Sequence, residues 1–282
     1  MKFGTHVSIA GGMEKAFERA DMVKAEVFQC FSRPPQGGKA PAITPEVIAR
    51  FNQAKQASKI REYYIHTPYF INLASAEPRI RHGSVSIIGE DLKRGSLLGF
   101  QYVNTHIGSA GESSKKEGVA LVIAGLKKIL DEHEGSSELL IEISAGAGNV
   151  IGSKFEEIAA ILEGVDAKHD GKLNVCFDTA HAFASGYDLK TEKVVKKTID
   201  DFDRIVGLKR LKLIHGNDSK VDLGECKDRH EHIGQGKIGL KGFKAFINDP
   251  RLQHLSFILE TPKDEPEDDP RNLKILRGMI GA

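Results

Sequence analysis

The chain alternates between short apolar runs and longer segments in which apolar residues recur at helical spacing. The apolar runs are rich in Val, Ile, Leu, Phe and Tyr, and they lie at residues 2–9, 25–31, 63–68, 101–108, 139–144, 173–179, 209–217 and 255–262. Such runs are typical of strands that are buried on both faces of a parallel sheet. We therefore predict one strand in each run.

Between these runs, three segments show clear helical patterns. Residues 43–60 begin with Thr44 as a capping residue and a proline in the first turn, and residues 153–165 and 191–207 each place apolar side chains on one face. Alternating strands and helices indicate a parallel sheet with helical crossovers. Eight such units in 282 residues predict an α/β fold, a closed (β/α)8 TIM barrel, that forms one domain over residues 1–282.

A doubly wound sheet is the alternative fold. It usually has fewer strands and a glycine-rich turn after its first strand, and here no GxGxxG motif follows the first apolar run. The barrel is therefore the preferred prediction.

Composition narrows the class of protein only a little. The formal net charge of +1 neither requires nor excludes a nucleic acid partner, because a local patch can still be basic. The three cysteines are widely spaced without a CxxC pair, which indicates a reducing compartment rather than a disulfide framework. The N-terminus has no apolar signal segment and no apolar stretch approaches the ~20 residues of a membrane span, so we expect a soluble cytoplasmic protein without a membrane partner.

Polar side chains stand at the ends of seven of the eight apolar runs. They are His6, His66, His106, Glu142, Asp178, His215 and Glu260, and His181, Asp228 and His230 follow in nearby segments. The carboxyl ends of the strands of a parallel barrel form one rim, where active sites lie. A single histidine there is usually structural, and a single carboxylate often caps the next helix. Carboxylates gathered without a cation would repel one another and take up protons, so the recurrence predicts a metal site.

The candidate ligands are imidazoles and carboxylates, without a thiolate. Such sets suit zinc, and also manganese or iron. The set is too large for a single ion, and a carboxylate can bridge two ions, so we expect two or three metals. His6 fits either a metal ligand or a substrate contact.

Four stretches form a specific pattern in their order along the chain: CFDTAHAFASGYD (176–188), IHGNDSK (214–220), KDRHEHIGQGKIG (227–239) and ILETP (258–262). Together with IHTPYFINLAS (65–75) and NTHIGS (104–109), they make the chain resemble, over essentially its whole length, the endonuclease IV family of zinc-dependent apurinic/apyrimidinic endonucleases. The resemblance implies a TIM barrel that holds three zinc ions and acts in DNA repair.

By position in these motifs, the resemblance implies three groups of zinc ligands. The first is His66, His106 and Glu142; the second is Glu142, as a bridge, with Asp178, His215 and Glu260; the third is His181, Asp228 and His230. Glu142 and Glu260 would be catalytic, because they would position the nucleophile. The implied reaction is hydrolysis of the phosphodiester bond 5′ to an abasic site in double-stranded DNA by a monomeric enzyme, which leaves a 3′-hydroxyl and a 5′-deoxyribose phosphate.

The resemblance also implies DNA contacts. Tyr69 and Phe70 match the positions with which the family penetrates the base stack, and the contacts expected from the rim are Arg33, Lys220, Arg229 and His6. The chain departs from the bacterial pattern in the loop FSRPPQGGKAP (31–41), because it has no Trp there or elsewhere, and in SAGAGN (144–149), where Ala147 stands in place of a Gln. These departures concern the DNA wedge rather than the metal ligands.

Two other functions fit parts of the pattern. A sugar isomerase or epimerase would use a single divalent ion, which Glu142, Asp178, His215 and Glu260 would hold, but it would not need the other five candidate ligands at the same rim. A non-catalytic DNA-binding relative has little reason to keep a complete ligand set. Both functions agree less well with the sequence than an abasic-site endonuclease.

Overall fold

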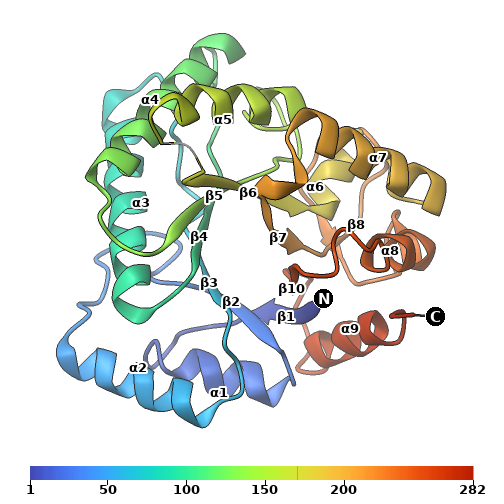
Figure 1. The fold of residues 1–282 in the computed structure, drawn as a ribbon, viewed down its shortest axis with the longest axis horizontal. Coiled ribbons are helices and arrows are strands. Elements are labelled where there is room, and N and C mark those ends of the chain that lie inside the picture. The colour runs from blue at the N-terminus through green and yellow to red at the C-terminus, as the bar shows by residue number, and fades with distance from the viewer. Residues whose placement is uncertain (170, 282) are drawn as a thin grey trace.

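The computed structural model describes residues 1–169 and 171–281. Eight parallel strands close into a barrel that is surrounded by helices (Figure 1). Around the barrel the order is β1 (Lys2–His6), β2 (Val27–Phe31), β3 (Tyr63–His66), β4 (Tyr102–Thr105), β5 (Glu138–Glu142), β6 (Leu173–Asp178), β7 (Leu211–His215) and β10 (Ser256–Leu259), which pairs again with β1. This arrangement confirms the predicted (β/α)8 TIM barrel.

The strands are shorter than the apolar runs that predicted them, because several runs continue into the loops at the barrel rim. The loop after β7 holds a small antiparallel ribbon of β8 (Asp218–Ser219) and β9 (His230–Glu231). This ribbon belongs to the carboxyl-end rim of the barrel, since it follows a barrel strand directly.

The helices begin and end where the sequence supplies local signals. They are α1 (Lys15–Met22), α2 (Pro45–Ala57), α3 (Pro78–Leu98), α4 (Lys115–Glu132), α5 (Phe155–His169), α6 (Thr179–Ala184), α7 (Glu192–Ile205), α8 (Gly239–Ile247) and α9 (Asp268–Arg277), with a 3-10 turn at Leu208–Arg210. Thr44 caps α2 by accepting a hydrogen bond from the Val47 backbone N–H, as predicted. A capping box of Ser114 and Glu117 begins α4. Across the described residues, none of the helices has the length and apolar character that a membrane crossing requires.

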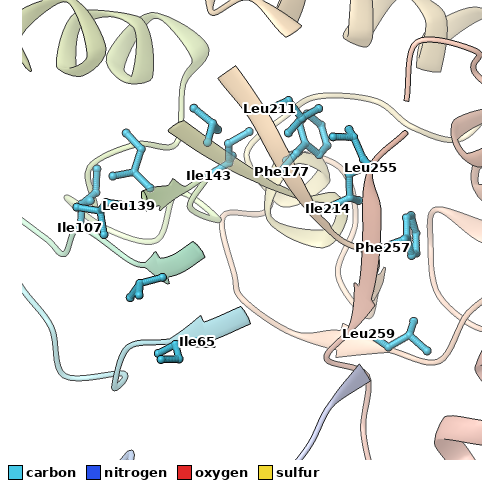
Figure 2. Close-up of a cluster of buried hydrophobic side chains, with 14 of the residues drawn as sticks. Ile65, Ile107, Leu139, Ile143, Phe177, Leu211, Ile214, Leu255, Phe257 and Leu259 are labelled. Carbon is cyan, nitrogen blue, oxygen red and sulfur yellow. The ribbon is translucent and has the colours of Figure 1, made fainter. Parts of the chain in front are cut away.

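The apolar core has two layers. The larger layer lies between the barrel and the helices, where residues such as Ile65, Leu139 and Phe257 pack (Figure 2). The smaller layer fills the barrel interior and consists of Val27, Tyr64, Leu140, Cys176, Leu213 and Ile258. Because successive side chains of a strand point to opposite faces, the strands supply both layers in alternation. The next inward-facing residues along the strands therefore lie directly against this interior apolar layer.

Candidate metal centre

The inward face of the barrel changes from apolar to polar toward its carboxyl end. Two positions beyond Leu140, Leu213 and Ile258 of the interior layer, the next inward residues are Glu142, His215 and Glu260. The same step of two leads on the other strands to His6, Gln29, His66, Asn104 and Asp178. Every strand thus contributes a polar side chain to one end of the barrel interior, as the active-site rim of this fold requires.

The first predicted ligand group lies close together around Glu142. The Nε2 atom of His66 is 3.2 Å from Oε2 of Glu142, and Nε2 of His106 is 3.9 Å from Oε1 of the same carboxylate. All three ligand atoms lie within 4.8 Å of one another. His66 ends β3, His106 directly follows β4 and Glu142 ends β5, and these three strands are neighbours in the barrel. The structure thus brings the first group together.

The second predicted group also converges. The Nδ1 atom of His215 lies 3.4 Å from Oε1 of Glu142, 3.9 Å from Oδ2 of Asp178 and 3.2 Å from Oε2 of Glu260. The four ligand atoms lie within 4.8 Å of one another. Glu142 therefore faces both groups, which is the arrangement expected of a bridging carboxylate.

The third predicted group forms around a short helix. Asp178 caps α6 by accepting a hydrogen bond of 2.7 Å from the backbone N–H of His181, which explains the three-residue spacing of this pair. Oδ1 of Asp228 lies 3.1 Å from Nε2 of His181 and 3.3 Å from Nε2 of His230. The ligand atoms of Asp178, His181 and His230 also lie within 4.8 Å of one another. The third group therefore adjoins the second through Asp178.

A buried carboxylate fixes the loop that carries Asp228 and His230. Asp218 accepts backbone hydrogen bonds from Ser219 at 2.8 Å, Gly234 at 2.9 Å and Ile238 at 2.9 Å. These contacts tie both ends of the loop to one side chain. Asp228 and His230, which lie outside the eight barrel strands, are thereby held in place.

Each inner histidine uses one ring nitrogen for a neighbouring oxygen and directs the other toward carboxylates. The anchored pairs are His66 Nδ1 with the Thr67 carbonyl at 2.6 Å, His181 Nδ1 with the Ile143 carbonyl at 3.0 Å, His230 Nδ1 with the Glu260 carbonyl at 3.0 Å, and His215 Nε2 with Oε1 of Gln29 at 2.9 Å. Metal-bound histidines have this form, because the anchored N–H fixes the tautomer and leaves the other nitrogen free to coordinate.

The free ring nitrogens of this cluster fit a metal cofactor. Among the described residues, the buried atoms without a hydrogen-bond partner include Oε1 of Glu142, Nε2 of His181, Nδ1 of His215 and Nε2 of His230. A buried polar atom that lacks a partner normally costs about 1–3 kcal/mol. Ligation of divalent cations would satisfy all four atoms at once. The donor set of imidazole and carboxylate is also the one that zinc, iron and manganese accept.

The charges of the cluster also favour a bound cation. Burial would raise the pKa of Glu142, but His106, His215 and His181 together hold that pKa well below its usual range. Burial would lower the pKa of His215, yet the carboxylates of Glu260 and Glu142 raise that pKa well above its ordinary value. Buried carboxylates that stay ionised demand positive charge beside them. Protons on the histidines or divalent cations can supply this charge, and the cations also satisfy the unpaired nitrogens.

A cavity of about 970 Å³ opens above the ligand groups. Its lining includes His6, His66, Tyr69, His106, His181 and Glu260. Tyr69 is 67% exposed and Phe70 is 44% exposed, so both aromatic rings stand at the rim in the loop after β3. Lys220 and Arg229 are also exposed, in the loop after β7. These positions leave the predicted DNA contacts accessible to a large ligand.

His6 lies inside the cavity rather than on its outer rim. Its Nδ1 atom is 3.1 Å from Nε2 of Gln29 and 3.6 Å from Oε1 of Glu260. Burial lowers the pKa of His6, although Glu260 opposes this effect. His6 thus touches the second ligand group without belonging to any of the close ligand sets, and a substrate contact stays a prediction.

Arg33 differs from the exposed phosphate-binding cation that its loop position suggested. Its side chain is only 5% exposed, and Nε lies 2.9 Å from Oδ1 of Asp91. Its Nη2 atom lies 2.9 Å from Oε2 of Glu90. The reason is that α3 places two carboxylates against the loop after β2, which sequence patterns do not reveal. Arg33 lines the cavity, but its charge is already partnered within the protein.

The sequence patterns missed four residues of the centre. Gln29, Asn104 and Asn217 donate hydrogen bonds to Glu260, Glu142 and Asp178, and Cys176 lies close to Glu142 and His215. Cys176 belongs to the apolar layer of the barrel interior. Burial raises the pKa of its thiol to about 12, so it is a neutral neighbour rather than a thiolate ligand.

The comparisons with known proteins concern the family of the chain and its fold. A family model described as a xylose isomerase-like TIM barrel matches residues 17–279. The probable endonuclease 4 of Methanoculleus marisnigri is 39% identical over 280 residues, which cover 99% of each chain. The probable endonuclease 4 of Aquifex aeolicus is 39% identical over 276 residues, or 98% of this chain and 96% of the relative.

Among the solved structures, one is similar in both sequence and fold, and another is similar in fold alone. Endonuclease IV from Thermus thermophilus superposes with a TM-score of 0.86 at 36% identity, over 99% of this chain and 98% of that one. A D-tagatose 3-epimerase-like protein superposes with a TM-score of 0.74 at 19% identity, over 99% and 97% of the two chains, and this likeness concerns the fold alone. By fold, the protein is a xylose isomerase-like TIM barrel enzyme. Within that class, the chain belongs to the endonuclease IV family.

Proposed function

We propose that the protein is a metal-dependent endonuclease of DNA repair that hydrolyses the phosphodiester bond 5′ to an abasic site, leaving a 3′-hydroxyl and a 5′-deoxyribose phosphate. One observation carries the proposal: nine side chains from seven separate segments of the chain converge in three adjoining groups at one end of the barrel. A single ion of four to six coordination would leave several of these ligand atoms unused.

The residues that would hold three zinc ions are the three groups described above. His66, His106 and Glu142 would hold the first; Glu142, Asp178, His215 and Glu260 the second; and His181, Asp228 and His230 the third. Bound zinc lowers the pKa of water to about 7 and neutralises charge that develops on phosphate oxygens. Manganese or iron at one or more positions would fit the same donors.

Glu142 and Glu260 are the side chains to which we assign the positioning of the attacking oxygen. Glu142 is fully buried, and its Oε1 atom is the one left without a hydrogen bond. Oε2 of Glu260 lies 3.2 Å from the same His215 nitrogen that faces Glu142. The two carboxylates therefore flank a common point. A group held there stands in a buried, preorganised environment, where electrostatic stabilisation is strongest.

Aromatic residues at the rim would favour binding at abasic sites. Extruding a nucleotide costs least where its base pairing is already lost. Tyr69 and Phe70 are exposed aromatic rings beside the cavity, and they would fill the gap that an extruded sugar leaves in the base stack. Tyr69 packs edge-on against Phe31 at 5.2 Å between ring centroids, so its position is supported from within the protein.

A sugar isomerase or epimerase is the second candidate, because Glu142, Asp178, His215 and Glu260 on their own form a compact ligand set for one ion. His66, His106, His181, Asp228 and His230 have no role in such a site. Their convergence on the same cavity therefore favours the nuclease.

Incision of a DNA duplex with one tetrahydrofuran abasic analogue tests the proposal. The metal-loaded protein is expected to cut this strand at the 5′ side of the analogue and to leave the matched undamaged duplex intact. A chelator should abolish the cut, and added zinc should restore it. A fully metal-loaded, folded protein that leaves the analogue uncut would refute the proposal, and epimerisation of a ketose by that preparation would support the second candidate.

A further inference from the structure

Three side-chain amides are buried within the candidate metal centre, and each donates to a different carboxylate. Nδ2 of Asn104 lies 2.5 Å from Oε2 of Glu142, Nδ2 of Asn217 lies 2.7 Å from Oδ2 of Asp178, and Nε2 of Gln29 lies 2.7 Å from Oε1 of Glu260. All three amides are fully buried. Burial of an amide is tolerated only where it is hydrogen-bonded, so these contacts determine how the amides lie.

Gln29 makes the most extensive contacts of the three. Its Nε2 atom donates to Glu260 and lies 3.1 Å from Nδ1 of His6, and its Oε1 atom lies 2.9 Å from Nε2 of His215. An amide oxygen can only accept, so the proton of His215 must lie on Nε2. In the neutral ring, which is the form that ligates a metal, Nδ1 of His215 then keeps its lone pair and faces Glu142 and Glu260. One amide thus fixes both the tautomer of a histidine and the rotation of a carboxylate.

The other two amides, Asn104 in β4 and Asn217 in the segment between β7 and β8, also hold carboxylates of the centre. Oδ1 of Asn217 accepts from the backbone N–H of Glu260 at 2.7 Å, so Asn217 joins the ends of β7 and β10 while it holds Asp178. Oδ1 of Asn104 is buried and has no hydrogen-bond partner among the described residues. The orientation of Asn104 is therefore set by Glu142, because the flipped amide would place an oxygen against the carboxylate.

Neutral donors have an effect that charged donors would not. A lysine or arginine at these positions would hold the carboxylates equally well, but its positive charge would oppose a divalent cation nearby. An amide fixes one oxygen of the carboxylate and leaves the negative charge in place. In Glu142 the second oxygen, Oε1, is the one without a partner. The amides therefore orient the ligand atoms at no electrostatic cost to the metal.

We propose that Gln29 is a positioning residue of the metal centre, which sets the ligating nitrogen of His215 and the orientation of Glu260, and that Asn104 and Asn217 do the same for Glu142 and Asp178. This inference rests on the metal centre of the proposed function. It concerns metal affinity rather than direct contact with DNA. Loss of a hydrogen bond to a metal ligand typically costs about 10- to 100-fold in affinity or activity.

Gln29→Met is the sharpest test, because methionine keeps the length of the side chain and removes the contacts of the amide with Glu260, His6 and His215. The matched control is Asn174→Leu: Asn174 is also buried in a barrel strand and donates to a carboxylate, Oε2 of Glu138 at 2.9 Å, but at the opposite end of the barrel. Zinc affinity is measured in the absence of DNA by competition with a chromophoric chelator. The visible spectrum of the cobalt-loaded protein reports on ligand geometry.

The expected result is that Gln29→Met weakens binding of at least one ion by about 10- to 100-fold and alters the cobalt spectrum. On the abasic duplex, kcat should fall while KM stays near the wild-type value. Asn174→Leu should lower only the melting temperature. If Gln29→Met does not fold, Gln29→Asn, which keeps an amide that is one methylene too short, should show a smaller loss of zinc affinity.

Wild-type zinc affinity and cobalt spectrum in these Gln29 variants, or an equal loss of affinity in Asn174→Leu, would overturn the inference. This failure is distinct from failure of the proposed function, which would appear in the wild-type protein as absent metal binding or absent incision.

Discussion

The ligands at the mouth of the barrel and the exposed residues around them differ in what holds them in place. Glu142, Asp178 and His215 are fully buried on strands, and each contacts several side chains of the centre. Tyr69 and Phe70, in contrast, are 67% and 44% exposed on a loop. The buried set is fixed by strand pairing and packing, whereas the exposed set is free to meet a partner. We infer that the first set determines the chemistry and the second determines what the chemistry acts on.

Removing a carboxylate of the candidate metal centre should have the largest effect. Glu142→Gln and Glu260→Gln each take a negative charge from the metal centre, and several kcal/mol of transition-state stabilisation correspond to a rate loss of about 1,000-fold or more. Binding to the abasic duplex should persist, because the exposed residues are unchanged. Single-turnover incision and a separate binding titration measure the two quantities. The exposed Glu134→Gln is the control. Near-normal incision by either the Glu142 or the Glu260 variant would contradict the inference that the ligand set determines the chemistry.

The loop after β2 is a part of the rim that is fixed by buried contacts, as the ligands are, and it therefore differs from the exposed residues. Asp91 of α3 is fully buried and accepts from Ser32 at 2.6 Å and from Arg33 at 2.9 Å. Asp91→Ala would leave the Arg33 guanidinium without its buried partner, which should cost about 3–5 kcal/mol of unfolding free energy. Denaturant titration measures this loss. A cost below about 1 kcal/mol would show that the loop after β2 is not anchored through Asp91.

The exposed aromatic rings should affect DNA recognition and not stability. Tyr69→Ala and Phe70→Ala should each weaken binding of the abasic duplex by about 1–3 kcal/mol, which is the range for aromatic stacking on a base. The melting temperature should stay unchanged, as it should for Met22→Ala, a control at a position that is 75% exposed. Equal affinity of the variants and the wild type for the abasic duplex would exclude these rings as the base-stack contacts.

The smallest effect is expected from the exposed cations. Lys220→Ala and Arg229→Ala should each reduce the slope of log affinity against log salt by about one unit, because one phosphate contact is lost. Lys59→Ala is the control, since Lys59 is exposed just before β3, at the opposite end of the barrel. A slope that stays the same in Lys220→Ala and Arg229→Ala would place the DNA path elsewhere on the rim.

The fold could be predicted from the sequence because buried parallel strands produce a simple pattern, in which short apolar runs alternate with helical segments. The ligand positions could be proposed because polar residues such as His66 and His215 end those runs. Gln29 was missed for a physical reason: it stands inside the run VFQCF, whose apolar residues continue to Phe31, so β2 shows no polar ending. Only the alternation of inward and outward side chains reveals that Gln29 faces the centre.

The residues on loops could not be placed in the same way. The partners of Arg33 lie on α3, and no local pattern connects that helix with the loop after β2. Loop conformation depends on such tertiary contacts rather than on a period of two or 3.6 residues. Asp228 and His230 were proposed from their polar segment and assigned to a ligand group by the resemblance, but the sequence did not identify Asp218 as the residue that fixes their loop.

The central claim is that the three adjoining ligand groups hold separate ions. Elemental analysis of the wild-type protein, loaded with zinc and freed of unbound metal, measures the number of ions per chain most directly. The account predicts three. One ion per chain, or none, would contradict it.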